Sequence, residues 1–183
     1  MARALVIVDI QDDYFPGGKF PLVGPEAAAA RAARLLDGFR AAGETIVHVR
    51  HVWDEPDAAF MKPGTPGIEI NAAVAPRDGE TVISKAHPNA FLETPLEQTL
   101  RAAGADELVV CGMMTSMCVD ATVRAAADLG FDVAVAHDAC AAPDLEFGGR
   151  RVAAADVHAA FLAALGSGYA RVAAADELLA KPS

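Results

Sequence analysis

The sequence passes from an apolar run to an alanine-rich one within a single segment, Cys111-Gly-Met-Met-Thr-Ser-Met-Cys118-Val-Asp-Ala-Thr-Val-Arg-Ala-Ala126. The run that leads into it, residues 107–113, is largely apolar, as in a strand that is buried on both faces. Residues 115–129 are rich in alanine, a strong helix former, and Gly130 is well placed to end a helix. We therefore expect a strand that turns directly into a helix, with Cys118 in the first helical turn.

The same alternation of strand and helix extends in both directions along the chain. Short apolar runs predict five further strands, at residues 4–9, 45–52, 81–85, 132–137 and 170–172. Helices are expected at 25–42, from Pro95 onward, between Gly149 and Leu165, and near the end of the chain. Strands separated by helix-length segments pair in parallel. The expected fold class is α/β: a three-layer α/β/α sandwich with a six-stranded parallel, Rossmann-like sheet, in a single domain over residues 1–183.

Composition excludes several classes of function. The formal net charge is −10, from 25 acidic and 15 basic residues, and such a field repels nucleic acid. No apolar run approaches the roughly 20 residues that a membrane span needs, so no membrane partner is expected. The apolar run that ends in Asp9 is too short for the core of a signal peptide, which predicts a cytoplasmic protein.

Three of the predicted elements bring reactive groups to one edge of the sheet. The first strand ends in Asp9, the third ends in Lys85, and the fourth leads into the helix that carries Cys118. Ligands bind outside the carboxyl ends of parallel strands, so these groups should meet there. A helix start and a nearby ammonium lower the pKa of a thiol, and a carboxylate can accept its proton. We expect Cys118 as nucleophile, Asp9 as base, and the N–H groups of Met114 and Cys118 as the oxyanion hole.

Each residue also has an ordinary interpretation when taken alone. A strand-end aspartate is often a turn residue, a lysine there is usually solvated, and a helical cysteine is often a small buried hydrophobe. Because all three residues are expected at the same edge of the sheet, these ordinary interpretations are disfavoured. The three cysteines show no disulfide or zinc spacing; Cys111 is expected in the sheet, and Cys140 is expected to be structural although it lies near enough to line the site.

The segment from Cys111 to Ala126 resembles the signature of the isochorismatase-like cysteine hydrolases. Two other segments resemble the same family, Val8-Asp9-Ile-Gln-Asp-Asp-Tyr-Phe15 and Lys85 followed by Pro88-Asn-Ala-Phe91. The resemblance covers nearly the whole chain in the right order and extends to the region around His158. It implies an Asp-Lys-Cys triad of Asp9, Lys85 and Cys118.

The resemblance carries further implications. It implies a cis peptide bond just before the nucleophile, which by position joins Met113 and Met114, and an assembly as a homo-oligomer (dimer or tetramer). It also implies hydrolysis of a C–N, amide-type bond of a small molecule through a thioester. Some members that act on isochorismate lack the cysteine and cleave a vinyl ether by acid catalysis. This isochorismatase-type reaction is the alternative within the enzyme class, although Cys118 favours acyl transfer through a thioester. A flavodoxin-like binding or redox-sensing module is the alternative outside it, although the carboxylates of Asp12 and Asp13 would repel a phosphate.

The metal site of the nicotinamidase branch is not expected in this chain. Its Asp-x-His-x-x-His pattern would place an aspartate two residues before His48, where the chain has Ile46. His48 and His51 are three apart on a predicted strand, so their side chains should face opposite ways. We therefore expect neither a metal nor another cofactor.

The substrate pocket is expected around the long irregular segment 53–79, since a loop of this length is usually functional or disordered. The side chains expected as pocket walls are Phe15, His51, Trp53, Met117 and Phe147.

Overall fold

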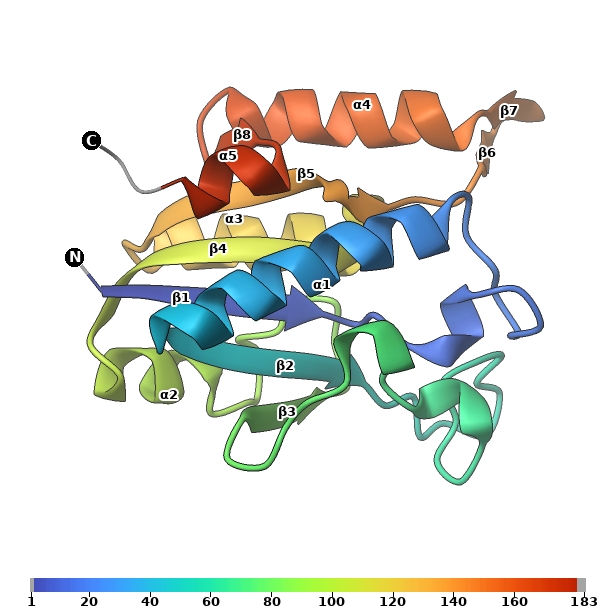
Figure 1. Cartoon of the computed structure of the whole chain (residues 1–183). Coiled ribbons are helices and arrows are strands. Elements are labelled where there is room, and N and C mark those ends of the chain that lie inside the picture. The colour runs from blue at the N-terminus through green and yellow to red at the C-terminus, as the bar shows by residue number, and fades with distance from the viewer. Residues whose placement is uncertain (1, 181–183) are drawn as a thin grey trace.

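The computed structural model describes residues 2–180, which form a six-stranded sheet with helices on both faces (Figure 1). The strands are β1 (Ala2–Val8), β2 (Thr45–His51), β3 (Thr81–Lys85), β4 (Ala105–Met113), β5 (Asp132–Ala141) and β8 (Arg171–Ala173). Their order across the sheet is β3-β2-β1-β4-β5-β8, and every neighbouring pair is parallel. The predicted fold class is confirmed.

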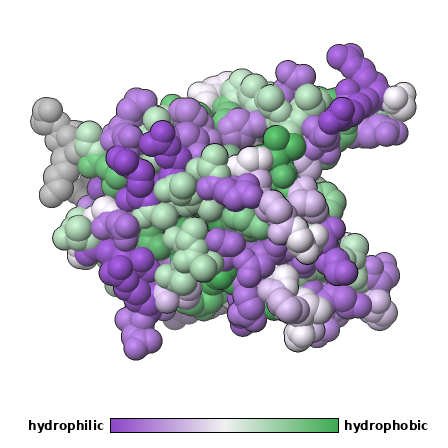
Figure 2. All heavy atoms as spheres, turned by 45° about the vertical axis from the view of Figure 1, so that its right-hand side comes forward, coloured by the Kyte–Doolittle hydropathy of each residue, from purple (hydrophilic) through white to green (hydrophobic). Residues whose placement is uncertain are grey.

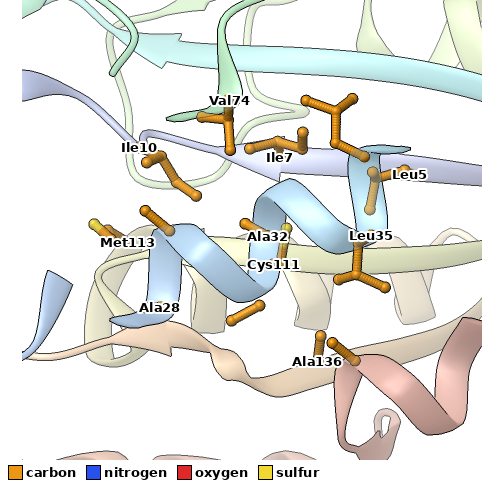
Figure 3. Close-up of a cluster of buried hydrophobic side chains, with 14 of the residues drawn as sticks. Leu5, Ile7, Ile10, Ala28, Ala32, Leu35, Val74, Cys111, Met113 and Ala136 are labelled. Atoms are coloured by element: carbon orange, nitrogen blue, oxygen red, sulfur yellow. The ribbon is translucent and has the colours of Figure 1, made fainter. Parts of the chain in front are cut away.

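Two hydrophobic clusters, one on each face of the sheet, hold the layers together. Helices α1 (Pro25–Ala42) and α5 (Ala175–Leu179) pack on one face. Figure 3 shows side chains of α1 against those of the central strands, such as Ala32 near Cys111. The second cluster joins the other face to helices α2 (Leu96–Ala102), α3 (Asp120–Asp128) and α4 (Ala154–Gly166). Burial on both faces explains why the central strands are almost entirely apolar.

The sheet has a topological switch point between β1 and β4, which is where this class of fold binds ligands. From β1 the chain proceeds outward through β2 and β3, and it then returns to the centre at β4 and proceeds the other way. The two strands approach closely at their carboxyl ends. A Cβ atom on Gly112 would lie 1.9 Å from the carbonyl oxygen of Val8, so only glycine fits there.

Helix α3 begins later than the sequence indicates. The expected helix 115–129 is divided into a single wide turn, η4 (Thr115–Val119), and α3 itself. The N–H of Val119 donates to the carbonyl oxygen of Met114, five residues back, at 3.1 Å. A π-type turn of this kind is frequent at functional sites.

A β-hairpin lies where the sequence predicted only the approach to a helix. Strands β6 (Leu145–Phe147) and β7 (Arg150–Val152) pair antiparallel, and α4 begins only at Ala154. The two glycines between the strands both have positive φ, 59° and 74°, as the tight two-residue hairpin turn requires. The hairpin extends from the body of the molecule in Figure 1, and Figure 2 shows an arm of mainly hydrophilic residues in the same place.

Across residues 2–180, no helix combines the length and the apolar composition that a membrane crossing requires.

Candidate active site

The structure brings Asp9, Lys85 and Cys118 together at the carboxyl ends of β1, β3 and β4. Nζ of Lys85 lies 2.6 Å from Oδ2 of Asp9 and 3.3 Å from Sγ of Cys118. All three side chains are buried, with 0% of Asp9, 3% of Lys85 and 4% of Cys118 exposed. A buried charge is tolerated only when it is paired, and the carboxylate and the ammonium neutralise each other here.

Asp9 is held in a form that suits a base. Its backbone has φ 51°, a left-handed conformation that is uncommon for a residue with a side chain. Its Oδ1 is buried and has no hydrogen-bond partner among residues 2–180, so a lone pair is free to accept a proton. Burial raises the pKa of Asp9 and outweighs the opposing effect of Lys85. A carboxylate with a raised pKa holds a transferred proton more tightly than an ordinary one.

The pKa of Cys118 was expected to be lowered, and this expectation is wrong. Burial raises the pKa of the thiol well above its usual range, the charge of Asp9 raises it further, and the lowering effect of Lys85 is smaller. A helix start and a cation lower the pKa of a thiol, but the loss of solvent on burial outweighs them here. At rest the sulfur is therefore a thiol, and a neighbouring base must remove its proton before it can attack.

The turn that carries the thiol has unusual backbone geometry. The peptide bond between Met113 and Met114 is cis, at the position given by the resemblance. The carbonyl oxygen of Met114 accepts from the N–H groups of Met117 and Val119, both at 3.1 Å, and not from that of Cys118 between them. The hydroxyl of Thr115 lies 2.9 Å from Nδ1 of His158.

His51 is the fourth side chain at this centre. It was predicted as a pocket wall, but its Nδ1 lies 3.0 Å from Nζ of Lys85. Burial lowers the pKa of His51 to about 4, and the charge of Lys85 adds to the effect, so the imidazole is neutral at pH 7 and accepts from the ammonium. The side-chain amide of Gln11 binds both backbone groups of His51, a contact that the sequence argument missed. The available signal was a polar residue, Gln11, two positions after Asp9 at the end of an apolar strand.

A possible ligand set for a metal coincides with the same centre. One atom each from Asp9, His51 and Cys118 all lie within 4.8 Å of one another. These side chains are the three that surround the Lys85 ammonium, so a positive charge already lies among them. An ion at this position would have to displace that ammonium. His48 is directed elsewhere, with its Nε2 3.0 Å from Oε2 of Glu80. The absence of a catalytic metal stays a prediction.

Two cavities are lined by two of the five predicted pocket walls. The first, of about 770 Å³, reaches Lys85 and is lined by Trp53 and by residues at the ends of β2 and β3. The second, of about 530 Å³, is lined by Phe15 and by parts of segment 59–71. Neither is lined by Met117, which is half exposed on η4, or by Phe147, which is 87% exposed on the hairpin. His51 is also absent from both linings, so the structure does not bring His51, Met117 or Phe147 to either cavity.

The other two thiols lie away from the reacting groups. Cys111 is buried in the cluster beneath α1, and burial raises its pKa well above the usual range. Cys140 is buried in β5, where its Sγ lies 3.4 Å from the carbonyl oxygen of Ala136 and burial raises its pKa to about 12.

Comparison with known proteins gives the class of this molecule. The family profile described as Isochorismatase domain matches residues 3–176. The chain therefore belongs to the isochorismatase family of hydrolases, as the sequence motifs indicated.

Individual relatives extend this comparison. The chain is 47% identical over 179 residues to the isochorismatase family protein YddQ of Bacillus subtilis (strain 168), covering 98% of this chain and 99% of that one. It is 38% identical over 178 residues to a streptothricin hydrolase of Streptomyces noursei, covering 96% of this chain but only 60% of that protein. The crystal structure of a protein assigned to the isochorismatase hydrolases from Oleispira antarctica is similar with a TM-score of 0.94 and 51% identity, over 97% of this chain and 96% of that one.

Proposed function

We propose that this protein is a cysteine hydrolase that cleaves a C–N, amide-type bond of a small molecule through a thioester. The observation that carries the proposal is the ammonium of Lys85 placed between the carboxylate of Asp9 and the sulfur of Cys118, at 2.6 Å and 3.3 Å, in a buried site. This arrangement supplies a nucleophile, a base and a fixed cation, which are the groups that acyl transfer through a thiol needs.

In the first half-reaction, Asp9 takes the proton of the Cys118 thiol, and the thiolate attacks the carbonyl carbon of the amide. The carbonyl oxygen becomes an oxyanion, and we assign the N–H groups of Met114 and Cys118 as its donors. Asp9 then gives its proton to the leaving nitrogen as the C–N bond breaks. The products are a free amine or ammonia and a thioester on Cys118.

In the second half-reaction, Asp9 is again a carboxylate and takes a proton from water. The resulting hydroxide adds to the thioester carbonyl, and the C–S bond breaks. The sulfur leaves as a thiolate, which the ammonium of Lys85 stabilises until Asp9 returns the proton. The acid product leaves, and the enzyme returns to its starting state.

A thiol is the feature that favours an amide over a vinyl ether. Ether cleavage by acid catalysis needs a proton donor but no nucleophile, whereas this site devotes its base and its cation to a sulfur atom. The named streptothricin hydrolase among the relatives supports a small-molecule substrate for this chain as well.

The proposal is tested with a panel of small amides assayed for release of ammonia or amine. We expect turnover of some members by the parent protein and none by Cys118→Ala. Rapid quenching and mass mapping should locate an acyl group on the peptide that contains Cys118. Turnover by Cys118→Ala, or turnover without any acylated Cys118, would contradict the proposal.

We also propose that the protein acts in the cytoplasm as a homo-oligomer, a dimer or tetramer. The exposed hairpin supports self-association, because the side chain of Phe147 is 87% exposed there and that of Leu145 is 41% exposed. Light scattering after size-exclusion chromatography should give a mass that is a multiple of 18.9 kDa. A monomer at micromolar concentration would contradict this part of the proposal.

A further inference from the structure

The ammonium of Lys85 has three N–H groups, and the structure provides three acceptors for them. Two belong to the proposed triad, Oδ2 of Asp9 and Sγ of Cys118. The third is Nδ1 of His51, at 3.0 Å. The hydrogen bonds to Cys118 and His51 and the ion pair with Asp9 leave the ammonium little freedom to turn, and one of its protons remains directed toward the sulfur.

His51 is held firmly in the position from which it binds Lys85. The two residues are direct partners in the parallel ladder between β2 and β3. Oε1 of Gln11 accepts from the His51 N–H at 2.7 Å, and Nε2 of Gln11 donates to the His51 carbonyl oxygen at 2.9 Å. Gln11 is itself fully buried. One amide side chain thus fixes the His51 backbone on both sides, as a neighbouring strand would.

The charges around the imidazole favour the same role. Lys85 lies against its Nδ1, His87 is a titratable neighbour, and Asp9 and Cys118 lie within 4.8 Å of a ring nitrogen. A neutral ring is a good acceptor, whereas a protonated one would place a second cation beside the ammonium. His51 is also a poor candidate for the base that activates Cys118, because its Nδ1 is already engaged by Lys85. Oδ1 of Asp9 is free for that task.

We infer that His51 is a positioning residue, which fixes the ammonium of Lys85 so that the ammonium stabilises the thiolate of Cys118. This inference rests on the proposed function for the role of Lys85. It predicts that loss of the Nδ1 acceptor lowers the thiolate fraction of Cys118. His51 exerts this effect through Lys85.

The test compares His51→Leu, which removes the acceptor, with His51→Asn, whose Oδ1 can take the place of Nδ1. The probe is iodoacetamide on the whole folded protein without substrate, with the rate of Cys118 labelling measured by mass mapping from pH 6 to 11. For His51→Leu we expect the labelling rate of Cys118 at each pH below the inflection to fall about tenfold, as an upward shift of the inflection by one pH unit would give. For His51→Asn we expect a profile near that of the parent.

A merely structural role for His51 would lower the melting temperature without moving the inflection. The inference is overturned when His51→Leu keeps the parent profile, or when both variants shift equally. Should His51→Leu fail to fold, His51→Ala repeats the acceptor-free measurement and decides the outcome in the same way. The two proposals fail separately. Turnover by Cys118→Ala contradicts the proposed function, whereas an inactive Cys118→Ala with an unchanged His51→Leu profile contradicts only the role of His51.

Discussion

Oδ2 of Asp9 and Nζ of Lys85 lie 2.6 Å apart, and neither side chain is exposed to solvent. Each residue keeps the other charged in a place where a lone charge would be too costly. The pair is therefore a unit, and removal of either member affects the survivor as well as the reaction. Variants of each residue separate the effect on its partner from the effect on the reaction.

Asp9→Asn keeps the shape of the side chain and removes the base. We expect the rate of thioester formation to fall by about two to four orders of magnitude, the range that general-base catalysis supplies. Single-turnover kinetics with an amide substrate measures that step directly. A melting temperature near that of the parent is the control for folding, and an acylation rate within a factor of a few of the parent would exclude Asp9 as the base.

Lys85→Met removes the cation and leaves a side chain of similar length. The pKa of Cys118 is already raised by burial and by Asp9, and Lys85 is the group that opposes both. We therefore expect the inflection of Cys118 alkylation to move further upward and turnover to fall sharply. Asp9→Asn is the matched comparison, since removal of a nearby anion should not raise that inflection. An unchanged profile with unchanged turnover would make Lys85 a bystander.

Activity should survive exhaustive dialysis against a strong chelator. The physical reason is that the ammonium of Lys85 already lies among Asp9, His51 and Cys118, the side chains that a metal would need. Turnover is measured before and after dialysis, and metal content is measured on the same samples. Loss of turnover that zinc or iron restores would identify these side chains as ligands and would reverse the assignment.

Glu80→Gln tests an ion-pair network on the opposite side of β2. Oε1 of Glu80 lies 2.7 Å from Nε of Arg40, and the hydrogen bond from Arg40 is the largest cause that lowers the pKa of Glu80 from 4.5 to about 2. A lowered folded-state pKa means that this stabilisation is complete above pH 4.5 and is lost as the pH falls toward 2. We expect the variant to lose about 1–3 kcal/mol of unfolding free energy at pH 7.

Urea denaturation of parent and Glu80→Gln across the acid range is the measurement. The difference between the two proteins should shrink steadily below pH 4.5. A difference that is the same at pH 7 and pH 2.5 would show that the charge of Glu80 contributes nothing.

Much of the site could be predicted because its parts are attached to regular elements. Asp9 directly follows β1 and Lys85 ends β3, and the parallel topology forces such ends to one edge of the sheet. The contacts of His51 were missed because strand periodicity gives the face of a side chain but not its partner. The thiol pKa was missed for a different reason, since local sequence shows the helix and the cation but not the depth of burial.

Loop geometry was the least predictable part of the chain. Gly148 and Gly149 were interpreted as the approach to a helix, whereas two adjacent glycines, here between Phe147 and Arg150, also fit a two-residue hairpin turn. Phe147 was expected as a pocket wall. The hairpin directs it outward instead, and no local pattern encodes that direction.

The segment 53–79 is attached to the residues after β1 at a few defined points. Asp13 accepts the Met61 N–H at 2.6 Å, Asp12 accepts from the Asn71 side chain at 2.8 Å, and Gln11 donates to the Ile68 carbonyl oxygen at 2.8 Å. The reacting groups, by contrast, stand on strand ends that this segment does not build. A descendant of this enzyme could therefore exchange the segment for one of another length and sequence, keep these anchor points, and acquire a new substrate while its reaction chemistry stays as it was inherited.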